Sequence, residues 1–168
     1  MNRLMRSKTE DKQHADKGSL TLIWLTILVS FVAAITFKSF YYFPISLYSF
    51  FPFMGLAFIL AGIVLRLVII STLGQFFTVD VTIRQHHQLK TDGFYKYVRH
   101  PSYSASLLSF IGFGISLNNW VSFTIVTISV VAAFLYRIKV EEEVLAQQFG
   151  ADYANYKSST KKIIPFVF

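Results

Sequence analysis

Long apolar runs alternate with short polar segments along most of the chain. Residues 18–37 carry no charge, and the next charge-free stretch, 39–65, is interrupted in its first part by Pro44 and Pro52. A helix that crosses the hydrocarbon core of a bilayer needs about 20 apolar residues. The pattern therefore predicts one membrane-spanning helix at 18–37 and a second at about 50–72.

A third charge-free stretch runs from residue 101 to residue 136. As a single helix it would be about 54 Å long, well beyond a hydrocarbon core of about 30 Å, so it must fold back on itself. The segment SLNNW (116–120) contains adjacent asparagines, which favour a turn, and a tryptophan, which suits the headgroup boundary. We expect two short helices, at roughly 101–117 and 120–136.

These elements predict an all-α integral membrane protein with about four transmembrane helices. A fifth is expected only if residues 39–52 form a re-entrant or interfacial segment. Residues 1–17 are polar and of mixed charge, and because no repeat or linker follows them, 18–168 is expected to be a single membrane-embedded domain. The composition agrees, since only 15% of residues are charged, against about 25% in soluble domains.

The cations indicate the orientation in the membrane. Of the 16 Lys and Arg, 14 lie in three segments, 1–17, 73–100 and 137–168. The positive-inside rule places these segments, and so both termini, in the cytoplasm. Arg66, near the end of the second predicted helix, is expected to snorkel to the interface. The net charge of +7 then reflects topology and not nucleic-acid binding.

Several kinds of site are excluded by the residues present. The chain has no cysteine, which excludes disulfides, thiolate metal sites and a cysteine nucleophile. His86 and His87 are adjacent and cannot share one face of a helix or strand, so no metal site is expected. The glycines of 112–114 lack the third glycine and the preceding strand of a dinucleotide-binding loop.

The segment GFYKYVRHPSY (93–103) joins the second and third apolar parts of the chain and concentrates polar and aromatic chemistry. Pro101 is well placed to open the next helix, because its missing N–H would be unpaired there in any case. One interpretation is an interfacial aromatic belt with cationic topology anchors, made of Tyr95, Tyr97, Tyr103, Lys96 and Arg99. The presence of His100 among them favours a functional site.

A second cluster, RIKVEEEVLAQQFGADYANY (137–156), begins where the last predicted span ends. Arg137 and Glu141 share a helix face at i and i+4. They form either a surface ion pair, contributing roughly 0.3–0.5 kcal/mol, or part of a site in which two of the three consecutive glutamates serve a ligand. The spacing of Leu145, Phe149, Tyr153 and Tyr156 predicts a packing stripe.

The two clusters together resemble the isoprenylcysteine carboxyl methyltransferase family. The similarity lies in HQLKTDGFYKYVRHPSY (87–103) and in RIKVEEEVLAQQFGADYANYKSSTKKIIP (137–165), about 34 residues apart. Members of this family are integral-membrane enzymes that use S-adenosylmethionine, and they are related to the phospholipid methyltransferases. The first half of the chain is similar only in being membrane-spanning.

The resemblance implies a cofactor held between a cytoplasmic loop before the C-terminal helical hairpin and a tail helix after it. The implied cofactor-binding residues are His87, Gln88, Leu89, Lys90 and Tyr95 on the adenosine side, His100, Pro101, Ser102 and Tyr103 at the methionine end, and Glu141 and Glu142 for the ribose hydroxyls or the ammonium. The implied catalytic residues are Arg137, which would orient an acceptor carboxylate, and Glu141, the candidate base for an amine acceptor.

The function that the resemblance implies is methyl transfer from S-adenosylmethionine to a lipophilic acceptor at the membrane–cytoplasm boundary. The acceptor, a lipophilic small molecule or a lipidated substrate, would enter from the bilayer, and the cofactor from the cytoplasm. Carboxylate O-methylation of the isoprenylcysteine type is the main expectation. N-methylation of a phospholipid head group and a non-enzymatic membrane scaffold are the alternatives, and neither a metal nor a nucleic-acid partner is expected.

Overall fold

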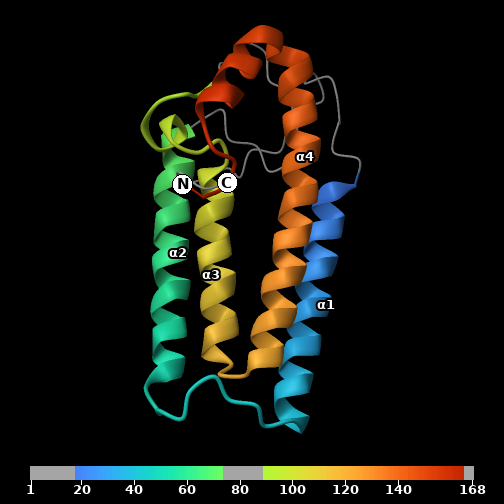
Figure 1. The fold of residues 1–168 in the computed structure, drawn as a ribbon, viewed down its shortest axis with the longest axis vertical. Helices are drawn as coiled ribbons and strands as arrows, with labels where there is room; N and C mark the ends of the chain where they lie inside the picture. The colour runs from blue at the N-terminus through green and yellow to red at the C-terminus, as the bar shows by residue number, and fades with distance from the viewer. Residues whose placement is uncertain (1–17, 74–88, 165–168) are drawn as a thin grey trace, which may run out of the picture.

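The chain folds into a bundle of helices that run side by side in the computed structural model, which describes residues 18–73 and 89–164 (Figure 1). The elements are α1 (Ser19–Phe40), α2 (Phe51–Leu73), the 3₁₀-helix η2 (Gly93–Lys96), α3 (Pro101–Ser116) and α4 (Trp120–Ser159). Within these ranges the one β-type pairing is an isolated parallel bridge between Val98 and Lys161. The predicted all-α fold is confirmed, whereas the arm 1–17 lies outside the described residues.

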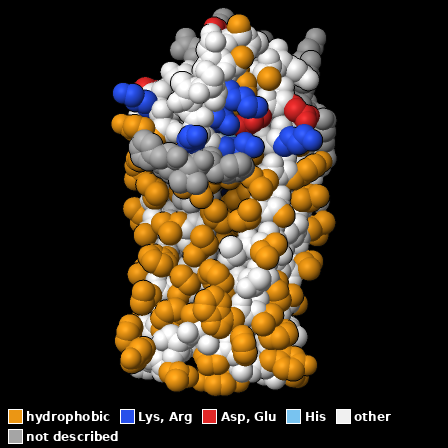
Figure 2. Space-filling view, viewed as in Figure 1, with side chains coloured by type: hydrophobic (Ala, Val, Ile, Leu, Met, Phe, Trp, Pro, Cys, Tyr) orange, Lys and Arg blue, Asp and Glu red, His pale blue; other side chains and the backbone are white. Residues whose placement is uncertain are grey.

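The bundle has the surface of a membrane protein. In length and composition α1, α2 and α4 are each able to cross a bilayer, and α3, with 16 residues, is shorter, about 24 Å. Hydrophobic side chains cover the sides of the bundle, and the charged side chains gather at one end (Figure 2). The last helix does not stop near residue 136 as expected; α4 has 40 residues and continues beyond the other helices (Figure 1).

Glycines let α2 and α3 pack backbone against backbone. A Cβ atom added at Gly62 would lie 2.6 Å from the carbonyl oxygen of Ala105, and one added at Gly112 would lie 2.6 Å from that of Gly55. Ser109 Oγ donates to the carbonyl of Ile59 on α2 at 3.2 Å. Small residues drive helix association in membranes in this way, because close contact replaces the hydrophobic effect.

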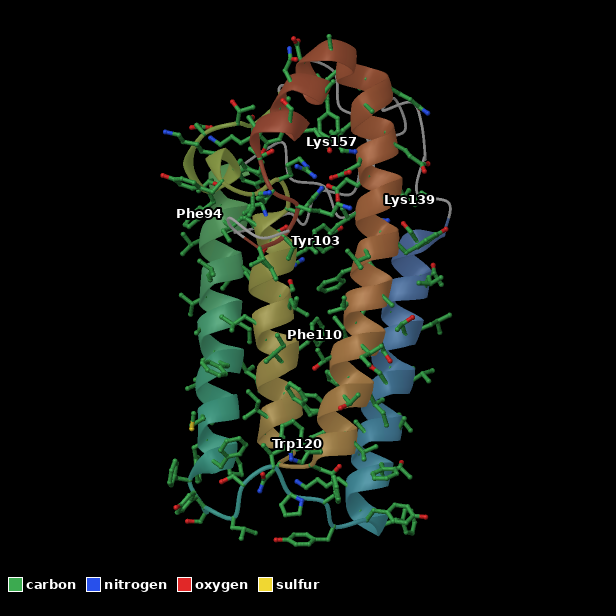
Figure 3. All side chains as sticks on the ribbon, in the orientation of Figure 1. Phe94, Tyr103, Phe110, Trp120, Lys139 and Lys157 are labelled. Carbon is green, nitrogen blue, oxygen red and sulfur yellow. The ribbon has the colours of Figure 1, made fainter. Side chains whose placement is uncertain are left out.

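A column of aromatic rings joins α1, α3 and α4. Phe31 stacks on Phe113 with ring centroids 4.0 Å apart, and Tyr103 meets Phe134 edge to face at 5.2 Å. Phe110 lies between α3 and α4 in the same column (Figure 3). The packing fixes the height of α3 relative to α4, and therefore the position of Tyr103 at the polar end.

The opposite end of the bundle is closed by the two adjacent asparagines that predicted a turn. Asn118 has a φ of 49°, and its amide donates to the carbonyl of Ser46 at 2.8 Å. Asn119 donates to the carbonyl of Tyr41 at 2.9 Å, and its side-chain oxygen caps α4 by accepting from two backbone N–H groups at 3.1 Å. Residues 41–50 form this non-helical connection, so they do not supply a fifth span.

Arg66 turns towards α3 instead of extending alone to the interface as expected. Its guanidinium donates to the carbonyl of Ser102 at 3.2 Å and to the hydroxyl of Ser106. The reason is that the close α2–α3 contact brings the first turns of α3 within reach. Arg66 therefore ties α2 to the segment that carries His100 and Tyr103.

Because α2 and α3 touch through their backbones, we expect Gly62→Val to lower the free energy of unfolding by about 1–3 kcal/mol. The valine side chain would force the two helices apart at Ala105 and Ser109. The measurement is thermal unfolding in detergent followed by circular dichroism. Ala61→Val is the matched control, because Ala61 is exposed on the same helix; equal losses in the two variants would contradict the packing role of Gly62.

Candidate active site

The residues of both sequence clusters meet at the charged end of the bundle. The start of α3, the middle of α4, the loop 89–100 and the tail after α4 all converge there (Figure 1). Tyr103 lies between α3 and α4, and Lys157 lies beyond it on the returning end of α4 (Figure 3). The site is therefore assembled from segments that are far apart in the sequence.

His100 is held in place by its neighbours in the tail. Arg99 N–H donates to the carbonyl of Lys161 at 2.8 Å, and His100 N–H donates to that of Lys162 at 3.1 Å. Pro101 then occupies the first position of α3, as the sequence predicts. His100 is only 4% exposed, so the surrounding side chains restrict the rotation of its imidazole ring.

Glu142 is the centre of a buried network of charges. Its Oε1 accepts from Arg99 Nε at 3.0 Å and lies 3.3 Å from His100 Nε2, while its Oε2 lies 3.1 Å from Lys157 Nζ. Arg99 also donates to the carbonyls of Lys157 and Thr160. One carboxylate therefore joins the loop before α3, the middle of α4 and the end of α4.

The network controls the ionisation of Glu142. Burial alone would raise the pKa of this carboxyl, but hydrogen bonds with His100, Arg99 and Lys157 outweigh the burial and hold the pKa well below its usual range. Glu142 is thus ionised at neutral pH. Its oxygens are occupied by protein groups, which favours a positioning role over direct contact with a ligand.

Glu141, the preceding residue, has fewer hydrogen-bond partners than Glu142 among the described residues. Its Oε2 is buried and has no hydrogen-bond partner, although His100 Nδ1 lies 3.7 Å away. The Tyr103 hydroxyl interacts electrostatically with both Glu141 and Arg137. The imidazole thus faces a carboxylate on each side, and one oxygen of Glu141 has no hydrogen-bond partner.

Arg137 sits one turn before Glu141 on α4, and its residue is 3% exposed. Its guanidinium donates to the hydroxyl of Ser19 at the start of α1, in addition to its interaction with Tyr103. The side chain is therefore a buried group between α1, α3 and α4, where the sequence also allowed a surface ion pair.

Three tyrosines line the side of the site formed by the loop and the tail. The Tyr156 hydroxyl donates to the carbonyl of Tyr95 at 2.7 Å, and burial, opposed by Arg99, raises the pKa of Tyr156 to about 12. The hydroxyls of Tyr95 and Tyr153 are buried without a hydrogen-bond partner. Burial, followed by the charge of Glu141, raises the pKa of Tyr95, and burial, followed by that of Glu142, raises the pKa of Tyr153, so both phenols keep their protons.

The remaining predicted residues are more scattered. Lys90 forms an ion pair of 2.9 Å with Asp92 on the exposed side of the loop, and Leu89 is half-buried. Ser102 contributes its carbonyl, which accepts from Arg66. The predicted contacts of His87 and Gln88 lie outside the described residues.

Sequence reasoning missed Arg99 and the end of α4 as parts of the site. Arg99 was expected to be a topology anchor, but it is buried and paired with Glu142. The sequence assigns Tyr153 and Tyr156 to a packing stripe, and it assigns Lys157 only to the cytoplasmic cations of 137–168. The available signal was the arrangement of cations on both sides of the glutamate run, but the pairing itself depends on the fold.

Glu142→Gln is expected to lower the free energy of unfolding by about 3 kcal/mol, because it leaves the buried Arg99 without its counter-charge. The folded-state pKa of Glu142 is lowered, so its contribution is fully present above the ordinary value of 4.5 and is lost as the pH falls below that value. The difference between wild type and variant should accordingly shrink as the pH falls below 4.5. Chemical unfolding in detergent at several pH values measures both effects.

Asp152→Asn is the matched control, because it removes the charge of an exposed carboxylate on the same helix. We expect it to change stability by no more than about 0.5 kcal/mol. A Glu142→Gln variant as stable as this control would contradict the central role of the network.

Comparisons with known proteins agree on one family. The family model described as isoprenylcysteine carboxyl methyltransferase (ICMT) matches residues 55–147. Protein-S-isoprenylcysteine O-methyltransferase B of Arabidopsis thaliana is 39% identical over 115 residues, which cover 67% of this chain and 58% of the relative. Protein-S-isoprenylcysteine O-methyltransferase of Schizosaccharomyces pombe is 32% identical over 123 residues, covering 72% of this chain and 52% of the relative.

A solved structure supports the same assignment. The eukaryotic intramembrane Ras methyltransferase ICMT matches with a TM-score of 0.69 and 28% identity, over 86% of this chain and 52% of that one. This chain thus spans only about half to three-fifths of the length of these relatives. The matched region 55–147 contains α3, His100, Arg137 and both glutamates of the site. This chain belongs to the isoprenylcysteine carboxyl methyltransferase family.

Proposed function

We propose that this chain transfers a methyl group from S-adenosylmethionine to the carboxylate of a lipophilic acceptor of the isoprenylcysteine type. The observation that carries the proposal is the buried oxygen of Glu141 that has no hydrogen-bond partner and lies near His100, Tyr103 and Arg137 at the polar end of an apolar bundle. The names of the matched relatives specify O-methylation of an isoprenylcysteine. They do not favour head-group N-methylation or a scaffold function.

The donors and acceptors at this site suit S-adenosylmethionine. This cofactor carries an ammonium and ribose hydroxyls, which donate hydrogen bonds to a carboxylate. It also carries a cationic sulfonium, which interacts favourably with aromatic faces. Glu141 has an unpaired oxygen for such a group, and Tyr95 has an unpaired hydroxyl. His100, Pro101, Ser102 and Tyr103 would form the methionine end, with Leu89 and Lys90, and His87 and Gln88 outside the described residues, towards the adenosine.

Glu142 has a different task in this proposal. Because Arg99, His100 and Lys157 occupy its carboxylate, it would act by fixing the loop and the imidazole and not by contacting the cofactor. His100, held between the two glutamates, would then present a fixed ring to the ligand.

The main catalytic contribution of the protein would be to align the reactants. When bound, S-adenosylmethionine supplies a methyl group on a sulfonium, which is a good leaving group. The acceptor carboxylate is ionised at neutral pH and would need no base, so the residues of the site would have only to hold its oxygen in line with the methyl group; the products would be a methyl ester and S-adenosylhomocysteine. Arg137 would orient the carboxylate through its planar guanidinium, and the apolar bundle would exclude water.

The orientation of the site in the membrane is a further part of the proposal. The positive-inside rule places the charged end of the bundle, and both termini, in the cytoplasm. The cofactor would then enter from the aqueous side and the acceptor from the bilayer.

Arg137→Lys is expected to lower turnover of N-acetyl-S-farnesylcysteine about 10- to 100-fold, with binding of S-adenosylhomocysteine kept within about threefold, because lysine retains the charge but loses the planar fork. Transfer of radiolabelled methyl groups from S-adenosylmethionine measures turnover, and mass spectrometry identifies the ester. Ser19→Ala is the control, because it removes the contact of Arg137 with α1 but keeps the guanidinium. An equal loss of turnover in Ser19→Ala would assign Arg137 a purely structural role, and wild-type protein without methyl transfer to any carboxylate would refute the function.

Topology is tested with single cysteines, since the chain has none of its own. Tyr48 and Lys96 are both exposed and lie at opposite ends of the bundle. We expect Lys96→Cys to be labelled by a membrane-impermeant maleimide only from the cytoplasmic side, and Tyr48→Cys only from the other side. Labelling of both from one side would contradict the proposed orientation.

A further inference from the structure

Unsatisfied polar atoms gather at the charged end of the bundle. Among the described residues, the buried side-chain atoms without a hydrogen-bond partner include the hydroxyls of Tyr95 and Tyr153 and the Oε2 of Glu141. Nearly all buried polar groups in native proteins are paired, so each exception calls for an explanation such as a bound molecule. Glu141 and Tyr95 already have a role in the proposed cofactor site, whereas Tyr153 lines the site without one.

A break in α4 brings Tyr153 to the site. Gly150 has φ 49° and ψ −117°, which interrupts the helix, and the residues after it fold back over the end of the bundle (Figure 1). Glycine adopts this left-handed backbone without a steric penalty. Tyr153, Tyr156 and Lys157 then follow at i, i+3 and i+4 and share one face of the returning helix.

That face is directed at the site. Tyr156 donates to the carbonyl of Tyr95 at 2.7 Å, and Lys157 lies 3.1 Å from Glu142 Oε2. Tyr153, on the same face, is only 2% exposed, and its ring centroid lies 6.3 Å from that of Tyr156.

The Tyr153 hydroxyl lies close to charges but is bonded to none of them. Glu141, Glu142 and Arg99 all act on it electrostatically. Arg99 and Glu142 are already paired with each other, whereas Glu141 is not fully satisfied. A molecule bound beside Glu141 would supply the hydrogen-bond partner that the Tyr153 hydroxyl lacks.

We propose that Tyr153 is a further cofactor-binding residue, whose hydroxyl exchanges a hydrogen bond with a ribose hydroxyl or the amino-acid end of the methyl donor held at Glu141. This inference rests on the proposed function. It also explains the break in α4 at Gly150, because a straight α4 would carry Tyr153 away from the site.

The test is Tyr153→Phe, which removes only the hydroxyl. We expect the dissociation constant of S-adenosylhomocysteine, measured by calorimetry in detergent, to rise about 3- to 10-fold, as for the loss of one hydrogen bond. The melting temperature of the ligand-free protein should stay the same or rise, because an unpaired buried hydroxyl is removed. Unchanged affinity would overturn the inference, and so would a fall in the ligand-free melting temperature, since it would reveal a structural partner.

Two matched variants serve as controls for this experiment. Tyr48→Phe makes the same change at the opposite end of the bundle and should alter neither quantity. Tyr156→Phe removes a hydroxyl that does have a partner, so it should lower the ligand-free melting temperature. A Tyr153→Phe protein that behaves like either variant contradicts the proposal.

Measuring the binding of S-adenosylhomocysteine to both wild type and Tyr153→Phe separates this inference from the proposed function on which it rests. If wild-type protein does not bind S-adenosylhomocysteine at all, the proposed function fails; if wild type and Tyr153→Phe bind it equally, only the role of Tyr153 fails. Methylthioadenosine, which lacks the amino-acid end, identifies the partner. A weaker binding of both ligands assigns Tyr153 to the ribose, and a weaker binding of S-adenosylhomocysteine alone assigns it to the amino-acid end.

Discussion

A single buried carboxylate, that of Glu142, holds the polar end of this protein together. It is ionised and nearly out of contact with water, which is costly unless cations compensate it. Arg99, His100 and Lys157 do so from three different segments. The same segments also bury apolar side chains, such as Val98, Val144 and Tyr156, and the charge pairing ties the segments to one another.

The bundle beneath provides the rigid base that such a network needs. Glycines bring α2 and α3 into backbone contact, and the aromatic column fixes α3 against α1 and α4. Arg66 connects α2 to the start of α3 through Ser102, and Arg137 connects α4 to the start of α1 through Ser19. Small errors in helix height would move His100 relative to the glutamates, so tight packing in the apolar part sets the geometry of the polar part.

The sequence predicted the helices well because the bilayer imposes a simple rule on them. Charge-free runs of about 20 residues and the asparagine pair at 118–119 placed α1, α2, α3 and the start of α4 to within a few residues, but not the end of α4. The resemblance brought His100, Glu141 and Arg137 to one site. The pairing of Arg99 with Glu142, 43 residues away, could not be predicted, because a cation near the membrane has the same local pattern whether it faces water or a buried carboxylate. The return of α4 after Gly150 was equally hidden, since a glycine signals that a helix can break but not where the chain goes next.

The division of work between Glu141 and Glu142 shows how a helix separates neighbours that are identical in sequence. Successive residues project about 100° apart around a helix axis. That rotation turns Glu142 towards the cations of the loop and the tail, and it leaves Glu141 facing His100 and Tyr103 with an unpaired oxygen. Exchanging the two roles would require a different register of α4, which the aromatic column does not allow. The carboxylate that holds the site and the one that is free to bind a ligand are therefore fixed by helix geometry, and not by any chemical difference between the two side chains.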